Sequence, residues 1–366
     1  MTNSKQQEIL RENNTARGDA LLLQDLAAVI ESTSDVWKEL RGSSLFITGG
    51  TGFIGSWLLE SLKWANQELE LRIQAQILTR DFNQYRKKHP HLANYPGFKF
   101  VVGDVRNFVS PRGEFSHVIH GATDSSQLVN TSYPKQMYDT IVSGTMRVLD
   151  FAAEKKCEKV LLLSSGAVYG SQPHTLTRMN EDWSDSPNLS DPINAYAEGK
   201  RGAEMLAAIY HKQFGLDITI ARIFALLGPY LPLEIHYAIG NFIKDAISGK
   251  SVIVNGSGLP VRSYLYASDL TTWLWKLMLY GQPGVAYNIG SEHEISLRDL
   301  AALVANTVGN GRYCILGEQD LGPNPGRYVP DTSRIRHELQ LSEKIHLEQA
   351  IYRTALWYGW KETGQK

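Results

Sequence analysis

A glycine-rich turn between an apolar strand and a helix places the strongest constraint on the fold. Glycines spaced G-x-G-x-x-G interrupt the segment Leu45-Phe-Ile-Thr-Gly-Gly-Thr-Gly-Phe-Ile-Gly55, and a helical pattern then runs from Phe53 to Leu62. Glycine tolerates positive φ, and a pyrophosphate approaches the backbone only where no Cβ intrudes. The first N–H groups and the dipole of the helix then bind the anion. A preceding strand and a following helix are the context that dinucleotide binding requires, so we expect this activity.

Length and composition exclude several classes of protein. The 366 residues suffice for one large domain or two ordinary ones. A net charge of −1 gives no basic excess for nucleic acid, and no apolar run reaches the length of a membrane span. Cys157 and Cys314 are too few for a disulfide framework and lack the spacing of metal ligands. Because Met1 to Gly18 is polar, unlike a signal peptide, we expect a cytoplasmic protein that binds neither nucleic acid nor membrane.

Beyond the glycine turn, short apolar strands alternate with longer amphipathic segments. This alternation predicts βαβ units and therefore an α/β fold with a doubly wound parallel sheet of the Rossmann type. Strands are expected at 45–48, 73–79, 99–102, 117–120, 160–164 and 218–222, and helices at 56–67, 135–155 and 196–214. Residues 1–17 are polar and predicted to be disordered, whereas 19–40 carry apolar residues at helical spacing.

The end of the second predicted strand bears on the choice of cofactor. In NAD binders an acidic side chain about 20 residues beyond the glycines takes the ribose hydroxyls. Here Thr79 is followed by Arg80, whose guanidinium suits a 2′-phosphate and favours NADP; the alternative is NAD held by Asp81. Asp104 follows the third strand, where it could accept the adenine amine, and residues 120–123 end the fourth strand close to the cofactor. Both an acidic residue in a turn and a glycine at a strand end are also common where no ligand binds.

A serine, a tyrosine and a lysine form the candidate catalytic set. Ser165 ends the fifth predicted strand, and Tyr196 and Lys200 share one face of a helix because they lie four residues apart. A free phenol has a pKa of roughly 10 and is a poor base at neutral pH. A neighbouring ammonium favours the phenolate and makes Tyr196 usable as a general acid/base, while Ser165 can bind the same substrate oxygen. Such tyrosine–lysine pairs occur by chance, and the glycine turn and serine upstream give this one its weight.

Together these motifs resemble the extended short-chain dehydrogenases/reductases, in particular the NAD-dependent epimerase/dehydratase family, whose members act on nucleotide sugars. The matching segments are 48–55, 104–105, 118–122, 164–170, Tyr196 with Lys200, 222–229, 256–269 and 327–333. The resemblance implies an N-terminal extension at 1–42, mainly a Rossmann domain at 43–228, and mainly a smaller α/β substrate-binding region at 229–366, from which some chain returns to the Rossmann domain.

The resemblance also implies a site. Catalysis would rest on Ser165, Tyr196 and Lys200. The cofactor would be bound by Gly49, Gly52, Phe53, Ile54, Gly55, Arg80, Asp104, Val105, Ala122 and Lys200. The nucleotide-diphosphate sugar would be bound by Thr123, Ser165, Asn241, Arg262 and Arg327. The arginine fork suits a pyrophosphate, although surface salt bridges are the alternative for both arginines. A homodimer is also expected.

The chain departs from the family's pattern at three places. Ala225 and Ile141 stand where asparagine is usual. After Ser165 come Gly166 and Ala167, where the 4,6-dehydratases carry an Asp–Glu pair that eliminates water. Since neither residue titrates, we predict that the protein is not a 4,6-dehydratase.

The sequence favours reduction of a 4-keto nucleotide sugar by NADPH. A C4 epimerase that retains NAD is the alternative, and a non-catalytic dinucleotide sensor on the same fold is a third reading. Two carboxylates bear on the elimination chemistry. Glu198 should point away from Tyr196 by helical geometry, whereas Asp124, after the fourth strand, stays a candidate.

Overall fold

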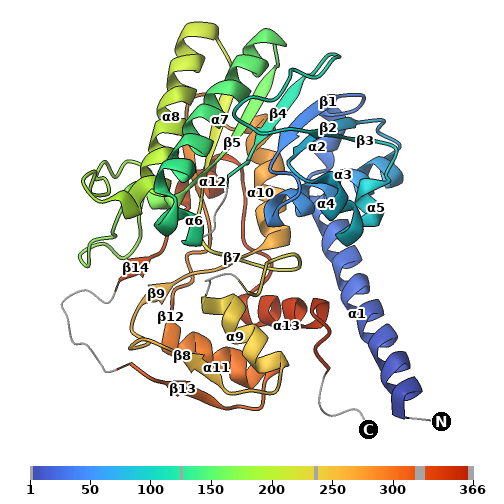
Figure 1. The fold of residues 1–366 in the computed structure, drawn as a ribbon, viewed down its shortest axis with the longest axis vertical. Coiled ribbons are helices and arrows are strands. Elements are labelled where there is room, and N and C mark those ends of the chain that lie inside the picture. The colour runs from blue at the N-terminus through green and yellow to red at the C-terminus, as the bar shows by residue number, and fades with distance from the viewer. Residues whose placement is uncertain (1–2, 124–126, 235–237, 318–325, 362–366) are drawn as a thin grey trace.

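A seven-stranded parallel sheet forms the centre of the computed structural model, which describes residues 3–123, 127–234, 238–317 and 326–361 (Figure 1). Its strands run in the order β11-β6-β5-β4-β1-β2-β3 and all pair in parallel. They are β1 (Ser44–Thr48), β2 (Gln74–Thr79), β3 (Phe98–Val102), β4 (His117–His120), β5 (Lys159–Ser165), β6 (Ile218–Ile223) and β11 (Ala286–Ile289). The reversal of strand order beside β1 is that of a doubly wound Rossmann fold, so the predicted fold class is confirmed.

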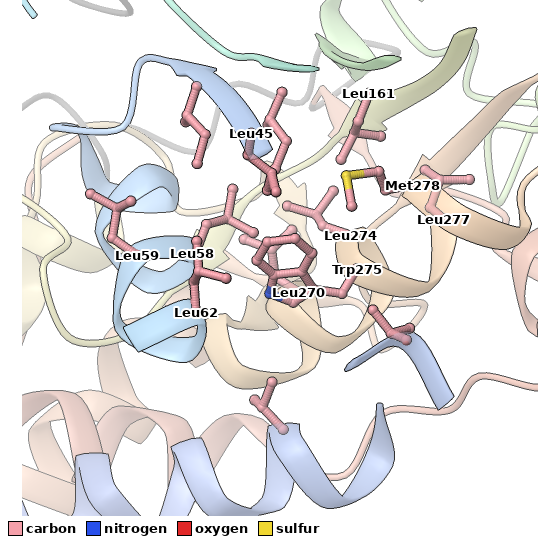
Figure 2. Close-up of a cluster of buried hydrophobic side chains, with 14 of the residues drawn as sticks. Leu45, Leu58, Leu59, Leu62, Leu161, Leu270, Leu274, Trp275, Leu277 and Met278 are labelled. Carbon is pink, nitrogen blue, oxygen red and sulfur yellow. The ribbon is translucent and has the colours of Figure 1, made fainter. Parts of the chain in front are cut away.

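Helices cover both faces of this sheet because the strand side chains alternate in direction. Leu45 and Ile47 of β1 pack with the leucines of α3 (Phe53–Leu69) and α10 (Ala267–Tyr280), as Figure 2 shows for Leu45. Phe46 packs on the opposite face with α7 (Pro134–Glu154) and α8 (Ala195–Phe214). The shorter elements around the sheet are α4 (Phe82–Lys88), α5 (Pro90–Ala93), α6 (Gln127–Ser132), α12 (Ser333–Glu338), η1 (Gly166–Tyr169) and η2 (Pro192–Asn194).

The N-terminus is helical, and the prediction of disorder over residues 1–17 is wrong from residue 3 onward. Helix α1 (Asn3–Ser32) is followed by α2 (Ser34–Glu39), in agreement with the helices expected within 19–40. Residues 3–16 are rich in good helix formers, so the packed C-terminal half of α1 can propagate through them. Buried Asp25 fixes this half, because it accepts a hydrogen bond from the Tyr266 hydroxyl (2.7 Å) and pairs with Arg353.

A smaller α/β layer lies beyond one end of the sheet (Figure 1). It contains α9 (Ala238–Ile247), α11 (Leu297–Val308), α13 (Leu347–Trp357), the pairs β7 (Leu226–Leu227) with β10 (Leu265–Tyr266) and β8 (Val252–Val254) with β13 (Tyr313–Ile315), and the ribbon β12 (Ile295–Ser296), β9 (Val261–Arg262), β14 (Arg327–Tyr328). Between these elements, α10 and β11 return the chain to the main sheet. None of the helices in the described residues combines the length and apolar character that crossing a membrane requires.

Candidate active site

The glycine turn leaves room for a pyrophosphate at the N-terminus of α3. Gly49 has a φ of +75°, and a Cβ there would lie 2.5 Å from the Gly121 backbone. A Cβ on Gly55 would lie 2.3 Å from the Gly49 carbonyl oxygen, so helix and turn touch. At Gly52, the N-cap, a Cβ would meet nothing closer than 3.4 Å, and no side chain caps the helix. The predicted residues Phe53 and Ile54 begin α3, and this open helix end fits the anion of a dinucleotide.

A buried polar chain supports the loop opposite this turn. His120, at the end of β4, pairs through Nδ1 with the Thr48 hydroxyl (2.7 Å) and through Nε2 with the Thr145 hydroxyl (3.0 Å). Thr48 also accepts the Ala122 N–H (3.2 Å). Burial, aided by the charge of Lys200, lowers the pKa of His120 to about 3, so the ring is neutral and serves as a fixed support.

The next predicted residue, Thr123, has a buried hydroxyl for which the described residues provide no hydrogen-bond partner. A buried, unpaired hydroxyl costs free energy unless a ligand or water satisfies it, which fits the predicted binding role. Asp124 lies outside the described residues.

Two charged residues at the end of β2, Arg80 and Asp81, have different surroundings. The Asp81 carboxylate accepts the N–H of Gln84 (2.9 Å) and caps α4, whereas Arg80 is exposed and its charge helps to lower the pKa of Asp104. Hydrogen bonds from Arg106 are the main cause of that shift and hold the pKa of Asp104 at about 2. Asp104 is therefore a carboxylate at neutral pH.

Val105 lies against α7. A Cβ on Gly144 of α7 would be 2.8 Å from the Val105 side chain. The glycine thus allows α7 to pack against the predicted adenine-binding loop.

The candidate catalytic residues come from the end of β5 and from α8. Ser165 is the last residue of that strand, and its hydroxyl accepts the Ala167 N–H (3.2 Å). Lys200 is buried, donates to the Leu163 carbonyl (2.7 Å) and has its Nζ 5.9 Å from the centre of the Tyr196 ring. Burial lowers the pKa of Lys200 to about 8, against an opposing effect of Glu204. A protonated Lys200 thus lies beside Tyr196 near neutral pH.

A polar network that the sequence did not predict lies beside Lys200. Glu204 follows Lys200 by one helical turn, pairs with Arg222 of β6 (2.7 Å) and accepts the Ser164 hydroxyl (2.5 Å). Arg222 in turn donates to the Tyr169 hydroxyl (2.8 Å). The i, i+4 spacing of Lys200 and Glu204 was the available signal, whereas the arginine comes from a distant strand.

The structure shows how the residues at the three departures from the family pattern are packed. Ile141 of α7 is buried and packs against α8, since a Cβ on Gly199 would lie 3.1 Å from its Cδ1. Ala225 is a partly buried apolar contact. At Gly166, a Cβ would lie 2.6 Å from the Phe224 ring and 2.7 Å from the Tyr328 hydroxyl oxygen. The position after Ser165 therefore has no room for an acidic side chain in this packing.

The predicted nucleotide ligands lie in the smaller layer. Arg262 and Arg327 stand on neighbouring strands, β9 and β14. Arg262 donates to backbone carbonyls, including that of Val261 (2.8 Å), and Arg327 pairs with Glu294. Asn241 is exposed on α9. The two arginines therefore lie on adjacent strands, but the register pairs Arg327 with Val261 and Arg262 with Tyr328, so their side chains start from opposite faces of the ribbon.

Comparison with known proteins agrees with this architecture. The profile of the NAD dependent epimerase/dehydratase family matches residues 45–290. UDP-glucuronic acid decarboxylase 6 of Arabidopsis thaliana is 30% identical over 85% of this chain and 90% of its own. UDP-glucuronic acid decarboxylase 1 of Xenopus tropicalis is 30% identical over 85% of this chain and 70% of its own.

Two solved structures share the fold. A double mutant of DesIV, a dTDP-glucose 4,6-dehydratase from Streptomyces venezuelae solved with NAD bound, has a TM-score of 0.73 and 26% identity over 86% of this chain and 96% of its own. UDP-glucose 4-epimerase of Thermotoga maritima, solved with UDP-glucose, has a TM-score of 0.72 and 20% identity over 86% of this chain and 98% of its own.

Proposed function

Because the chain belongs to the NAD-dependent epimerase/dehydratase family, we propose that it is an NAD(P)-dependent enzyme acting at a carbinol or ketone carbon of a nucleotide sugar. The observation that supports this proposal is the position of buried Lys200, which donates to the carbonyl of Leu163, two residues before Ser165, and lies 5.9 Å from the centre of the Tyr196 ring. The end of β5 is on the same edge of the sheet as the glycine turn. Ligands of open parallel sheets bind at this edge, outside the carboxyl ends of the strands.

Each residue of the set has a separate role in the proposed reaction. Tyr196 exchanges a proton with the sugar oxygen, and Ser165 shares the hydrogen bond to that oxygen. Lys200 stabilises the phenolate form of Tyr196 and binds the nicotinamide ribose. When bound, the cofactor supplies the hydride chemistry. The arginines Arg262 and Arg327 would hold the diphosphate.

Within this class we favour reduction of a 4-keto nucleotide sugar by NADPH. The supporting observation is the pair at the end of β2: the Asp81 carboxylate caps α4, which leaves exposed Arg80 for a 2′-phosphate. The runner-up is a C4 epimerase with retained NAD, and it draws support from the NAD held by the DesIV dehydratase.

Cofactor consumption separates these reactions. The protein would be incubated with NADPH or NADH and with one of two substrates, a 4-keto nucleotide sugar or a nucleotide sugar that carries a hydroxyl group on C4. Reduced nicotinamide would be followed by absorbance, and the sugars would be separated and identified. A reductase oxidises one NADPH per sugar reduced, whereas an epimerase interconverts sugars with no net change. A protein that binds the dinucleotide and turns over neither substrate would be a sensor. Mass spectrometry of the cofactor that co-purifies with the protein gives an independent answer.

Elimination of water is not expected, because Gly166 is packed against Phe224 and Tyr328 and Ala167 has no titratable group. Glu198, a further carboxylate of the catalytic helix, pairs with Arg201 instead (3.5 Å). The check is incubation with nucleotide-diphosphate hexoses and NAD(P), with mass spectrometry for a product lighter by one water. A 4-keto-6-deoxy product at enzymatic rates would contradict this prediction, and Asp124 would be the first residue to mutate.

We also propose a homodimer formed through α7 and α8, which lie side by side in Figure 1. Large apolar side chains are exposed on both helices: Tyr138 (45%) and Met146 (43%) on α7, Met205 (63%) and Ile209 (40%) on α8. A second copy would remove these surfaces from water. Light scattering should give the mass of a dimer, and Met205→Glu should shift it toward the monomer. A monomeric wild-type protein at micromolar concentration would contradict the proposal.

A further inference from the structure

Helix α8, which carries the proposed acid/base, is not capped by a side chain of its own N-terminus. Tyr196 lies in the first turn, where backbone N–H groups have no partner within the helix. Asn194 at the N-cap is a residue type that usually caps helices, but here its side chain makes no cap bond. Its amide donates to the Asn188 carbonyl instead (3.0 Å). The Tyr196 N–H therefore needs an acceptor from another part of the chain.

Asn130 of α6 provides that acceptor. Its Oδ1 accepts the Tyr196 N–H (3.0 Å), and its Nδ2 donates to the Ile193 carbonyl (2.7 Å). The two bonds fix the orientation of the amide, because one partner is a donor and the other an acceptor. Since Ile193 belongs to η2, one side chain holds the backbone on both sides of the junction between η2 and α8.

The helix that carries Asn130 is itself held by packing. Helix α6 lies against α7 and η2 (Figure 1). Val129, next to Asn130, packs against the hydrophobic cluster that contains Ile141 of α7, and Tyr196 packs against the same cluster. Asn130 therefore starts from a supported position, so its bond to the Tyr196 N–H can fix where the first turn of α8 lies.

On the premise of the proposed function, we propose that Asn130 is a positioning residue for Tyr196, which acts by fixing the backbone from which the phenol extends. Proton transfer requires the phenol oxygen within hydrogen-bond reach of the sugar oxygen, and a misplacement of about 1 Å can cost about 100-fold in rate. Lys200, one helical turn further on, is bonded to the Leu163 carbonyl. Asn130 thus fixes the first turn of α8 and Lys200 the second.

Three variants separate this role from a general contribution to stability. Asn130→Ala removes both hydrogen bonds. Asn130→Asp loses the donor but keeps an acceptor for the Tyr196 N–H, and aspartate serves as well as asparagine at a helix N-terminus. Asn310→Ala is the matched control in the smaller layer. Asn310 makes the same pair of bonds, because it accepts the Arg312 N–H (3.1 Å) and donates to the Gly249 carbonyl (3.1 Å).

Hydrogen exchange followed by mass spectrometry measures the contact without any substrate. In Asn130→Ala, the amides at the start of α8, residues 195–199, should exchange about 2- to 12-fold faster, the effect of losing one neutral hydrogen bond. In Asn130→Asp and Asn310→Ala, the same amides should exchange as in the wild type. Thermal unfolding reports whether each variant is folded.

Turnover measures whether the contact matters for proton transfer. The probes are dTDP-4-keto-6-deoxyglucose with NADPH for a reductase and UDP-glucose with NAD for an epimerase. With the probe that the wild type turns over, Asn130→Ala should lower kcat by about 10- to 100-fold. The KM for the sugar and the calorimetric Kd of the dinucleotide should stay within about twofold. Asn130→Asp should recover most of kcat, and Asn310→Ala should keep all of it.

The competing outcomes are distinct. Unchanged exchange at the start of α8 in Asn130→Ala overturns the inference, and so does faster exchange with a wild-type kcat. An Asn130→Asp variant as slow as Asn130→Ala, or an equal loss of kcat in Asn310→Ala, also overturns it. Each of these results leaves the proposed function intact. A wild type that turns over neither probe contradicts the proposed function, and the inference fails with it.

Discussion

Two glycines of the predicted cofactor turn, Gly55 and Gly52, should respond differently to alanine, because a Cβ would clash with backbone atoms only at Gly55. A Cβ on Gly55 would lie 2.3 Å from the Gly49 carbonyl oxygen and 2.4 Å from Gly50 Cα. Both neighbours are backbone, so the start of α3 must retreat by about 1 Å to restore ordinary contact. Overpacking of this kind destabilises the fold by roughly 1–3 kcal/mol, and a displacement of about 1 Å also disrupts anion binding.

Gly52→Ala is the informative partner of this variant. Its φ of −89° suits alanine, and the nearest atom to the new Cβ is 3.4 Å away, so the fold should keep its stability. The methyl group would nevertheless stand at the N-cap of α3, where we propose that the pyrophosphate binds. Loss of one charge-assisted N–H contact is worth about 1.5–3 kcal/mol, which is roughly a 10- to 100-fold rise in the dinucleotide Kd.

Urea unfolding and calorimetric titration with NADP and NAD measure the two quantities separately. Gly55→Ala should lose stability and affinity together, whereas Gly52→Ala should lose affinity alone. If Gly52→Ala binds the dinucleotide as well as the wild type does, the turn is not the cofactor site and the reasoning from its geometry is refuted.

Three further predictions concern the reaction. Tyr196→Phe should keep the fold and cofactor affinity but lower kcat by about 100- to 10,000-fold, the usual contribution of a general acid–base group; a near wild-type kcat would remove Tyr196 from the mechanism. Arg80→Ala should weaken NADPH more than NADH in titrations of both, and equal weakening or tight NAD binding by the wild type would favour the epimerase reading. Glu204→Gln removes the charge that opposes the lowering of the Lys200 pKa from its usual value to about 8. Because activity requires protonated Lys200 and is lost as pH rises through its pKa, the alkaline limb of the kcat/KM profile should move to lower pH, and an unmoved limb would show that Glu204 does not act on Lys200.

Six of the seven strands of the central sheet were predictable because their signal is local, whereas the edge strand β11 was not predicted. Apolar runs bounded by glycine and charge place strands β1 to β6 within one residue of their observed ends, and the reversal of strand order follows from the βαβ pattern. The N-terminal helix was missed because the polarity of residues 3–17 resembles that of a disordered segment. This helix is held by Asp25, which contacts Tyr266 and Arg353. These three residues are far apart in the sequence, so no local pattern predicts their contact.

The candidate site divides in the same way. Lys200 and Tyr196 are near in sequence, and the helix period alone places them on one face, so their proposed roles stay predictions with a local basis. The neighbours that set their chemistry come from elsewhere, as Arg222 does when it orients Glu204 behind Lys200.

Gly166 illustrates the limit most clearly. In the sequence it is a missing carboxylate, and the inference stops at a reaction that the chain should not perform. In the structure the absence of a side chain at this glycine allows a phenol from β14 to pack against the end of β5, since a Cβ would lie 2.7 Å from the Tyr328 hydroxyl oxygen. The absence of a side chain at Gly166 and the packing of the Tyr328 phenol at that position therefore depend on each other. The chemistry is proposed to rest on β5 and α8, while β14, which consists of Arg327 and Tyr328, closes the position that the 4,6-dehydratases use for an acidic side chain.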